Sequence, residues 1–136
     1  MIEFSALSLG AFNRLDRAHW GRLVAEDPEY RRAARWATFP VRIEADTDHV
    51  DIVAGPAGLS FDAGASDGHA DPIILSGSAE AWDAFLQLRP FPPNHSILGM
   101  ERRRDDFRII GDRHQFLRNL RPLVIMLDLM RLAIER

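Results

Sequence analysis

The sequence contains no cysteine and no lysine. Without cysteine, the fold has no disulfide bond, no thiolate zinc site and no cysteine nucleophile. All 17 basic side chains are arginine, a pattern typical of the codon usage of a GC-rich bacterial genome. The 20 acidic side chains outnumber them and give a net charge of -3, whereas proteins that bind a phosphate backbone normally have a basic excess. The composition therefore argues against nucleic acid as a partner.

Long apolar runs are also missing from the sequence. No stretch is apolar over the length of about 20 residues that a transmembrane helix needs, and the N-terminal residues lack the basic flank and apolar stretch of a signal peptide. We therefore expect a cytoplasmic protein without a transmembrane segment. The glycine-rich patterns of dinucleotide sites and P-loops are absent, so no motif indicates a nucleotide site, and we expect no cofactor.

A chain of 136 residues is long enough for one domain of ordinary size, which buries about two-thirds of its unfolded surface around a single core. We find no internal repeat, low-complexity tract or linker that would mark a domain boundary. The longest polar stretch that contains glycine, residues 64–72, is predicted to be a loop. We therefore expect residues 1–136 to form a single domain.

Helical spacing begins near the N-terminus, where apolar or half-apolar side chains recur at Phe12, Leu15, His19 and Leu23. This spacing predicts a first helix over residues 9–26. Asp27 followed by proline predicts the cap and first position of a second helix, over residues 28–37.

The pattern then changes to the alternation of β-strands. Three strands are predicted over residues 41–45, 50–54 and 59–63, and a fourth over residues 72–76. Ser78 is placed to cap a helix that buries Trp82, Phe85 and Leu86. A short helix at residues 95–100, a charged strand approach and a fifth strand at residues 107–110 follow, and the last helix starts at Asp112 with Gln115 in the capping-box position. This order of elements predicts an α+β domain.

The C-terminal helix is apolar around more of its circumference than one sheet can cover. Pro122 predicts a kink or a fresh start. One stripe is expected to pack on the sheet: Phe116, Leu120, Leu123, Val124 and Leu127. A second stripe contains Ile125 and Ala133 together with four residues that we expect at a subunit interface: Met126, Leu129, Met130 and Leu132. The alternatives for this second stripe are cover by other core elements, such as the first helix, and the mouth of a ligand site.

Two segments, ILSGSAEAWDAFLQ and FRIIGDRHQFLRNLRPLVIML, resemble in their order and spacing the sterol carrier protein 2 (SCP2) sterol-binding domain. The resemblance spans residues 10–132. It implies a five-stranded, mainly antiparallel sheet covered by N-terminal, middle and C-terminal helices, with an apolar cavity between sheet and C-terminal helices for sterols, acyl chains or fatty acyl-CoA. It implies no cofactor and no reaction. The cavity wall expected from it is Trp82, Phe85, Ile97, Phe107, Ile109, Leu120, Val124 and Leu127.

Candidate catalytic and metal-binding residues are few. Asp67, His69 and Asp71 alternate in a polar segment, a pattern more typical of a turn than of a divalent metal site. No catalytic triad can be named, and we predict no metal site and no enzymatic activity. The charge run ERRRDD is expected to be a solvated strand approach, with the alternative that Arg102, Arg103 and Arg104 surround a cavity mouth and bind an anionic ligand group.

The sequence leaves two functions of different classes. The first is non-catalytic carriage of a lipid or other apolar small molecule. The second is an accessory subunit that docks on a partner enzyme or forms a homodimer through the C-terminal helix. Burial of apolar surface would drive either association.

Overall fold

The computed structural model describes residues 10–61 and 71–136. It has an α+β fold with one five-stranded sheet, which confirms the predicted fold class. Within the described residues, no helix combines the length and apolarity needed to cross a bilayer. The elements follow in the order η1 (Phe12–Arg14), α2 (Arg17–Glu26), α3 (Pro28–Ala33), β1 (Phe39–Ala45), β2 (Asp48–Gly55), β3 (Gly58–Ser60), β4 (Ile73–Gly77), α4 (Ala79–Phe85), α5 (Ile97–Arg103), β5 (Phe107–Ile110), α6 (Arg113–Arg118), α7 (Leu120–Met130) and η3 (Arg131–Ala133).

The sheet has the strand order β3-β2-β1-β4-β5. The central strand β1 pairs antiparallel with β2 and parallel with β4. The two edge strands, β3 and β5, pair antiparallel with β2 and β4. The sheet is therefore mainly antiparallel, as predicted, and its single parallel pair lies at the centre.

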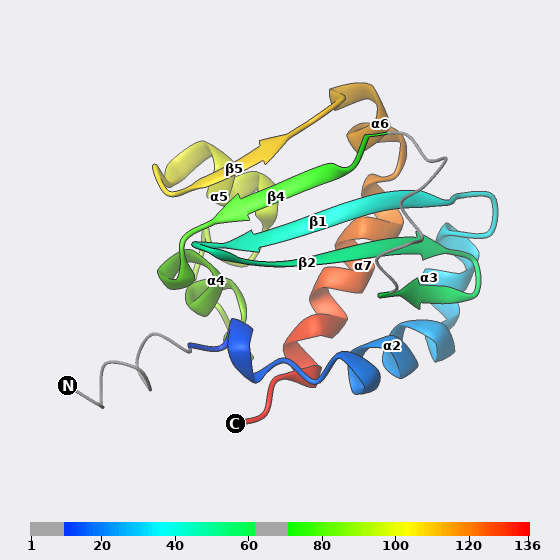
Figure 1. Ribbon diagram of the computed structural model, residues 1–136, viewed down its shortest axis with the longest axis horizontal. Coiled ribbons are helices and arrows are strands. Elements are labelled where there is room, and N and C mark those ends of the chain that lie inside the picture. The colour runs from blue at the N-terminus through cyan, green and yellow to red at the C-terminus, as the bar shows by residue number, and fades with distance from the viewer. Residues whose placement is uncertain (1–9, 62–70) are drawn as a thin grey trace.

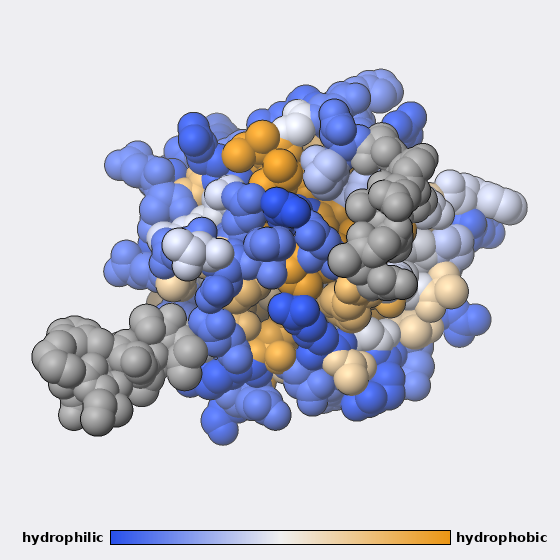
Figure 2. All heavy atoms as spheres, viewed as in Figure 1, coloured by the Kyte–Doolittle hydropathy of each residue, from blue (hydrophilic) through white to orange (hydrophobic). Residues whose placement is uncertain are grey.

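Among the described residues, helix α7 lies on one face of this sheet, where Figure 1 shows it passing behind β1 and β2. On that face β1 contributes Phe39, Val41 and Ile43, all of which are buried. The opposite face is partly polar, because Arg42 of β1 pairs with Asp51 of β2 at 2.7 Å between Nε and Oδ1. Figure 2 looks onto that second face and shows hydrophilic side chains interspersed with apolar ones.

The predicted N-terminal helix over residues 9–26 is wrong in its first half. The chain forms the single turn η1, becomes extended at Leu15, and starts α2 only at Arg17. Leu15 forms a β-bridge with Ile134 near the C-terminus, and Asp16 caps α2 by accepting a hydrogen bond from the amide of His19. An N-cap needs an extended backbone, so the helix cannot continue back through Asp16.

Two other helix boundaries differ from the prediction. Asp27 caps α3 as expected, but the helix ends at Ala33, and the chain has become strand β1 by Phe39. The charge run at residues 101–106 is not a strand approach throughout, since α5 continues to Arg103. Burial of Ile97 and Met100 anchors α5, and tertiary packing of this kind overrides the local charge pattern.

The C-terminal helical region is broken into two helices, as Pro122 predicted. α6 ends at Arg118 and α7 starts at Leu120, which places Pro122 in the first turn of α7, where a missing amide costs little. Asp112 caps α6 by accepting hydrogen bonds from two backbone amides. Gln115 does not complete a capping box; its side-chain amide donates instead to the Asp71 carbonyl at 2.9 Å.

The second apolar stripe of α7 lies largely inside the chain. Met126 and Met130 are fully buried, and the indole Nε1 of Trp20 donates a hydrogen bond to the Met126 carbonyl at 2.8 Å. Leu129 is partly buried against the same core, and Leu132 alone among the four residues expected at an interface is strongly exposed. The assignment of Met126 and Met130 to an interface is therefore corrected, because both side chains are buried within the chain, where α2 and α3 pack against α7.

Candidate functional site

An apolar hollow lies between α4, α5 and α7, and we call it the α7 hollow. Its volume is about 240 Å³, and it is lined by Phe85, His95, Ser96, Ile97, Val124, Leu127 and Asp128. Four of these residues belong to the cavity wall expected from the sequence: Phe85, Ile97, Val124 and Leu127. The lining has an apolar floor and a polar rim.

Local structure places each apolar wall residue. Phe85 is the last residue of α4, and Ile97 is the first of α5, directly after the cap residue Ser96. Val124 and Leu127 are three residues apart in α7 and therefore lie on one face of that helix. Leu127 is buried, whereas Val124 is 38% exposed, so Leu127 belongs to the floor and Val124 to the edge of the hollow.

Arg131 holds the wall of the α7 hollow together. Its Nε donates to the Phe85 carbonyl at 2.7 Å, and its Nη2 donates to the His95 carbonyl at 3.1 Å. Its Nη1 forms an ion pair with Asp128 at 2.8 Å, and its guanidinium lies 4.1 Å from the centre of the Phe85 ring. Sequence reasoning missed this residue, because no local pattern links it to partners 46 and 36 positions away.

The other four expected wall residues do not line the α7 hollow. Trp82 and Phe107 pack edge to face, with ring centroids 5.5 Å apart, and the Trp82 indole donates to the Glu44 carbonyl at 2.8 Å. Ile109 and Leu120 are partly buried and pack against the main core. These side chains fill space between the sheet and the helices rather than surrounding the hollow.

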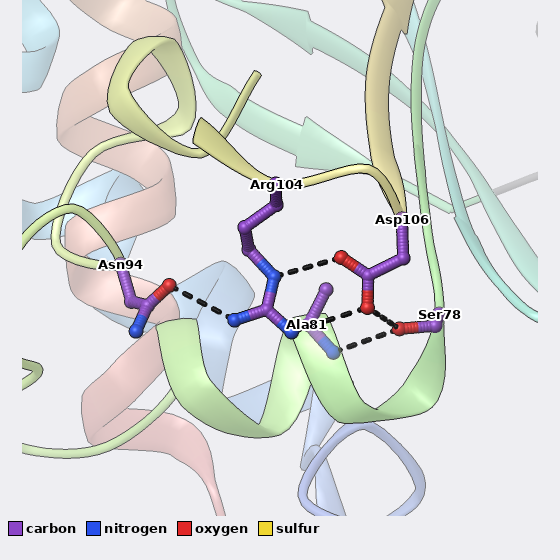
Figure 3. A network of polar contacts seen from close by, with 5 residues as sticks. All are labelled: Ser78, Ala81, Asn94, Arg104 and Asp106. Carbon is purple, nitrogen blue, oxygen red and sulfur yellow. Dashed lines mark hydrogen bonds and ion pairs between the residues drawn. The ribbon is translucent and has the colours of Figure 1, made fainter. Parts of the chain in front are cut away.

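A polar network joins the start of α4 to the segment before β5 (Figure 3). Arg104 binds both carboxylate oxygens of Asp106, at 2.8 and 3.1 Å, and donates to the Asn94 side chain at 3.1 Å. Ser78 donates to Asp106 at 2.6 Å while its Oγ accepts from the Ala81 amide. The hydrogen bonds from Arg104, with a further contribution from Ser78, lower the pKa of Asp106 from 3.8 to about 2.

This network argues against the alternative that Arg102, Arg103 and Arg104 together surround one cavity mouth. The guanidinium of Arg104 is directed to Asp106 and Asn94 within the chain. Arg102 and Arg103 line a neighbouring hollow of about 390 Å³ together with Pro92, Pro93 and Gly99, and this hollow shares His95 with the α7 hollow. The network therefore serves to join α4, α5 and β5, and we assign it no reaction, because the Asp106 carboxylate is held as an ion-paired acceptor.

No group of three His, Asp or Glu side chains that could hold a metal ion is found in residues 10–61 and 71–136. Asp67 and His69 of the alternating segment lie outside the described residues, and Asp71 alone of that set is described.

The chain matches no protein-family model, and no curated protein or solved structure is significantly similar to it. The α7 hollow and the residues around it are therefore the basis for assigning a function.

Proposed function

We propose that the chain binds the apolar part of a small molecule in the α7 hollow, without catalysing a reaction. The observation that carries this proposal is the convergence of Phe85, Ile97, Val124 and Leu127, from three different helices, on one hollow. Ligand sites are typically concave, mainly apolar and bordered by a few polar groups. Membership of the SCP2 sterol-binding domain family and a cytoplasmic location belong to the same proposal.

The volume of the α7 hollow limits the ligand. A hollow of about 240 Å³ can enclose a medium-length acyl chain or a compact branched hydrocarbon. The larger fused rings of a sterol would extend out of it into solvent, and their burial would be incomplete. An acyl chain therefore fits the proposal better than a sterol does.

The polar rim orients such a ligand. His95, Ser96 and Asp128 lie at the hollow beside the apolar floor, and His95 and Asp128 are exposed. The hydrocarbon end of the ligand would contact Leu127, and its polar end would stay with the rim residues and water, where its hydration is kept.

The proposal is tested by isothermal calorimetry with octanoate. Each methylene that leaves water contributes about 0.8 kcal/mol, so we expect a dissociation constant on the order of 10⁻⁴ M and saturation at one ligand per chain. Val124→Arg places a charge at the edge of the hollow, where the half-exposed site allows the variant to fold. We expect it to weaken binding at least tenfold.

The matched control is Leu117→Arg, since Leu117 is exposed on α6 and does not line the α7 hollow. This variant is expected to bind octanoate like the parent chain. Equal binding by the parent chain and both variants would reject the α7 hollow as the site, and no heat of binding in the parent chain would reject the proposed function.

A second candidate function, an accessory subunit, is favoured by two strongly exposed apolar side chains, Phe91 in the loop after α4 and Leu132 in η3. Phe91 is 83% exposed and Leu132 is 55% exposed. The C-terminal segment lies against the loop after α4, because Arg136 donates to the Leu86 carbonyl at 2.7 Å. Exposed apolar groups of this kind are typical of partner contacts when they gather in one patch. Sedimentation equilibrium tests the homodimer: a monomer at 100 µM would reject it.

A further inference from the structure

A second hollow, of about 460 Å³, lies between the segment after α3 and the junction of α6 with α7. We call it the Trp36 hollow. The residues that give it chemical character are Trp36, Thr38, Gln115, Arg118 and Asn119, and two alanines complete it. It shares no lining residue with the α7 hollow.

Trp36 is unusual because its side chain is 89% exposed. Tryptophan is normally among the more buried residues of a folded protein, and the other two, Trp20 and Trp82, are completely buried here. The guanidinium of Arg35 lies 5.5 Å from the centre of the Trp36 ring. An exposed indole at the border of a hollow offers a flat surface on which a ring can stack.

The floor of the Trp36 hollow contains the two buried polar side chains of the described residues, Gln115 and Asn119. Their side-chain N–H groups donate to the carbonyls of Asp71 and Gln115, respectively. No described donor reaches the side-chain carbonyl oxygen of either amide, and no described side-chain oxygen is both fully enclosed and without a partner. Within residues 10–61 and 71–136, both oxygens therefore lack a donor and can accept a hydrogen bond from N–H or O–H groups of a ligand.

Arg118 adds a positive charge to the same hollow. Within residues 10–61 and 71–136, no carboxylate lies at ion-pair distance from it. Its neighbour in the next helix, Arg121, is by contrast paired with Glu29 at 3.1 Å. A guanidinium without a carboxylate partner is suited to bidentate binding of a phosphate or carboxylate group.

We infer that the Trp36 hollow binds a small anionic ring compound of the nucleoside monophosphate type. The base stacks on Trp36, N–H or O–H groups of the base or sugar donate to Gln115 and Asn119, and the phosphate pairs with Arg118. This site depends on none of the residues of the α7 hollow and uses none of the glycine-rich nucleotide motifs. Its ligand therefore differs in class from an acyl chain.

The test uses the parent chain, uridine 5′-monophosphate and two-dimensional ¹H–¹⁵N NMR. The three indole N–H signals report separately on the three tryptophans. We expect the nucleotide to shift the Trp36 indole signal and the amides of residues 36–38 and 115–119, and to leave the signals of Trp20 and Trp82 unchanged. Uridine, which lacks the phosphate, is expected to bind at least tenfold more weakly.

Trp36→Ala and Arg118→Ala are each expected to weaken nucleotide binding at least tenfold. Matched controls are Phe91→Ala, which removes another exposed aromatic side chain, and Arg108→Ala, which removes an exposed arginine of β5; neither should change the affinity. Absence of shifts at 10 mM nucleotide, shifts that map elsewhere, or equal affinity of parent and variants would overturn the inference. Self-association that buries Trp36 would overturn it as well, and sedimentation of the same samples detects it.

Discussion

Gly77 shows how closely single atoms are packed where β4 ends. A Cβ atom at this position would lie 2.8 Å from Cδ1 of Phe107 and 3.0 Å from Nε1 of Trp82. The indole cannot move away freely, because it donates a hydrogen bond to the Glu44 carbonyl. The aromatic cluster therefore requires glycine here for space rather than for backbone conformation.

We expect Gly77→Ala to lower the free energy of unfolding by about 1–3 kcal/mol, since overpacking forces rings off their preferred positions. Gly21→Ala is the matched control. Gly21 lies inside α2, and its added Cβ would meet Phe61 at an ordinary 3.6 Å. That variant should be more stable than the parent by about 0.5–1 kcal/mol. Urea unfolding measures both, and a stabilising Gly77→Ala would contradict the packing described for the cluster.

Asp106 makes the stability of the fold depend on pH under acidic conditions. Its pKa falls from 3.8 in the unfolded chain to about 2 in the fold, so the ionised group stabilises the fold above pH 3.8, and this contribution is lost as the pH falls towards 2. The full shift corresponds to at most about 2.5 kcal/mol. Because the side chain is 34% exposed, solvent screening reduces this to about 1 kcal/mol.

Asp106→Asn is therefore expected to lower the free energy of unfolding by about 1 kcal/mol at pH 7 and to match the parent chain near pH 2. Asp105→Asn serves as the control, because Asp105 is the exposed neighbour, and it should leave stability unchanged at both values. If Asp106→Asn lowered the free energy of unfolding by the same amount at pH 7 and at pH 2, the ion pair with Arg104 would not be the cause of the lower stability.

At the scale of elements, α7 is a core helix on two sides. The sheet covers one side, and α2 and α3 pack against α7 elsewhere, so that Met126 and Met130 are buried. Met130→Glu would bury a carboxylate without a partner, and we expect a loss of more than about 3 kcal/mol in the free energy of unfolding. Leu132→Glu is the control; because Leu132 is 55% exposed, its replacement should cost less than about 0.5 kcal/mol.

Thermal melting and light scattering on the same samples measure the stability and the assembly of the two variants. The interface assignment of this side of α7 would be restored by one outcome: the parent chain is a dimer, and the Met130→Glu variant is a monomer with the same melting temperature.

Elements that depend on local chemistry could be predicted from the sequence. The caps at Asp27, Ser78 and Asp112 each accept the expected backbone hydrogen bond, and the alternating apolar residues of β1 and β2 fix which face is buried. The helix boundaries that were predicted wrongly depend on contacts with residues far away in the sequence. Leu15 is extended because it pairs with Ile134, and no pattern within residues 9–26 encodes that contact.

The same distinction applies to the candidate site. Phe85, Val124 and Leu127 could be predicted because their helical spacing marks inward faces. Trp82 follows the same helical pattern and Phe107 begins a strand, and yet both fill the core, since sequence spacing does not separate a cavity wall from a packed interior. Arg131 could not be predicted because its two carbonyl partners, on Phe85 and His95, are set by tertiary structure; only its ion pair with Asp128, three residues away, is local.

At the scale of the whole molecule, α7 packs on one face of the sheet, and both hollows are lined by residues of the helices and of the segments next to them. The Trp36 hollow lies at the N-terminal end of α7, beside Arg118 and Asn119, whereas the α7 hollow lies further along this helix, between Val124 and Asp128. The linings of the two hollows differ in character. The α7 hollow has an apolar floor, whereas the Trp36 hollow contains an arginine and two side-chain amide groups. The fold therefore separates an apolar site from a polar one along a single helix.

The central claim, that an acyl chain occupies the α7 hollow, is tested most directly by intermolecular nuclear Overhauser effects between octanoate and a chain with ¹³C-labelled methyl groups. The account predicts contacts from the octanoate hydrocarbon to the methyl groups of Ile97, Val124 and Leu127, and none to Ile43 or Leu75 in the core beneath the sheet. Contacts to Ile43 and Leu75 would place the ligand between sheet and helices and contradict the account, as would the absence of any contact at a saturating concentration of octanoate.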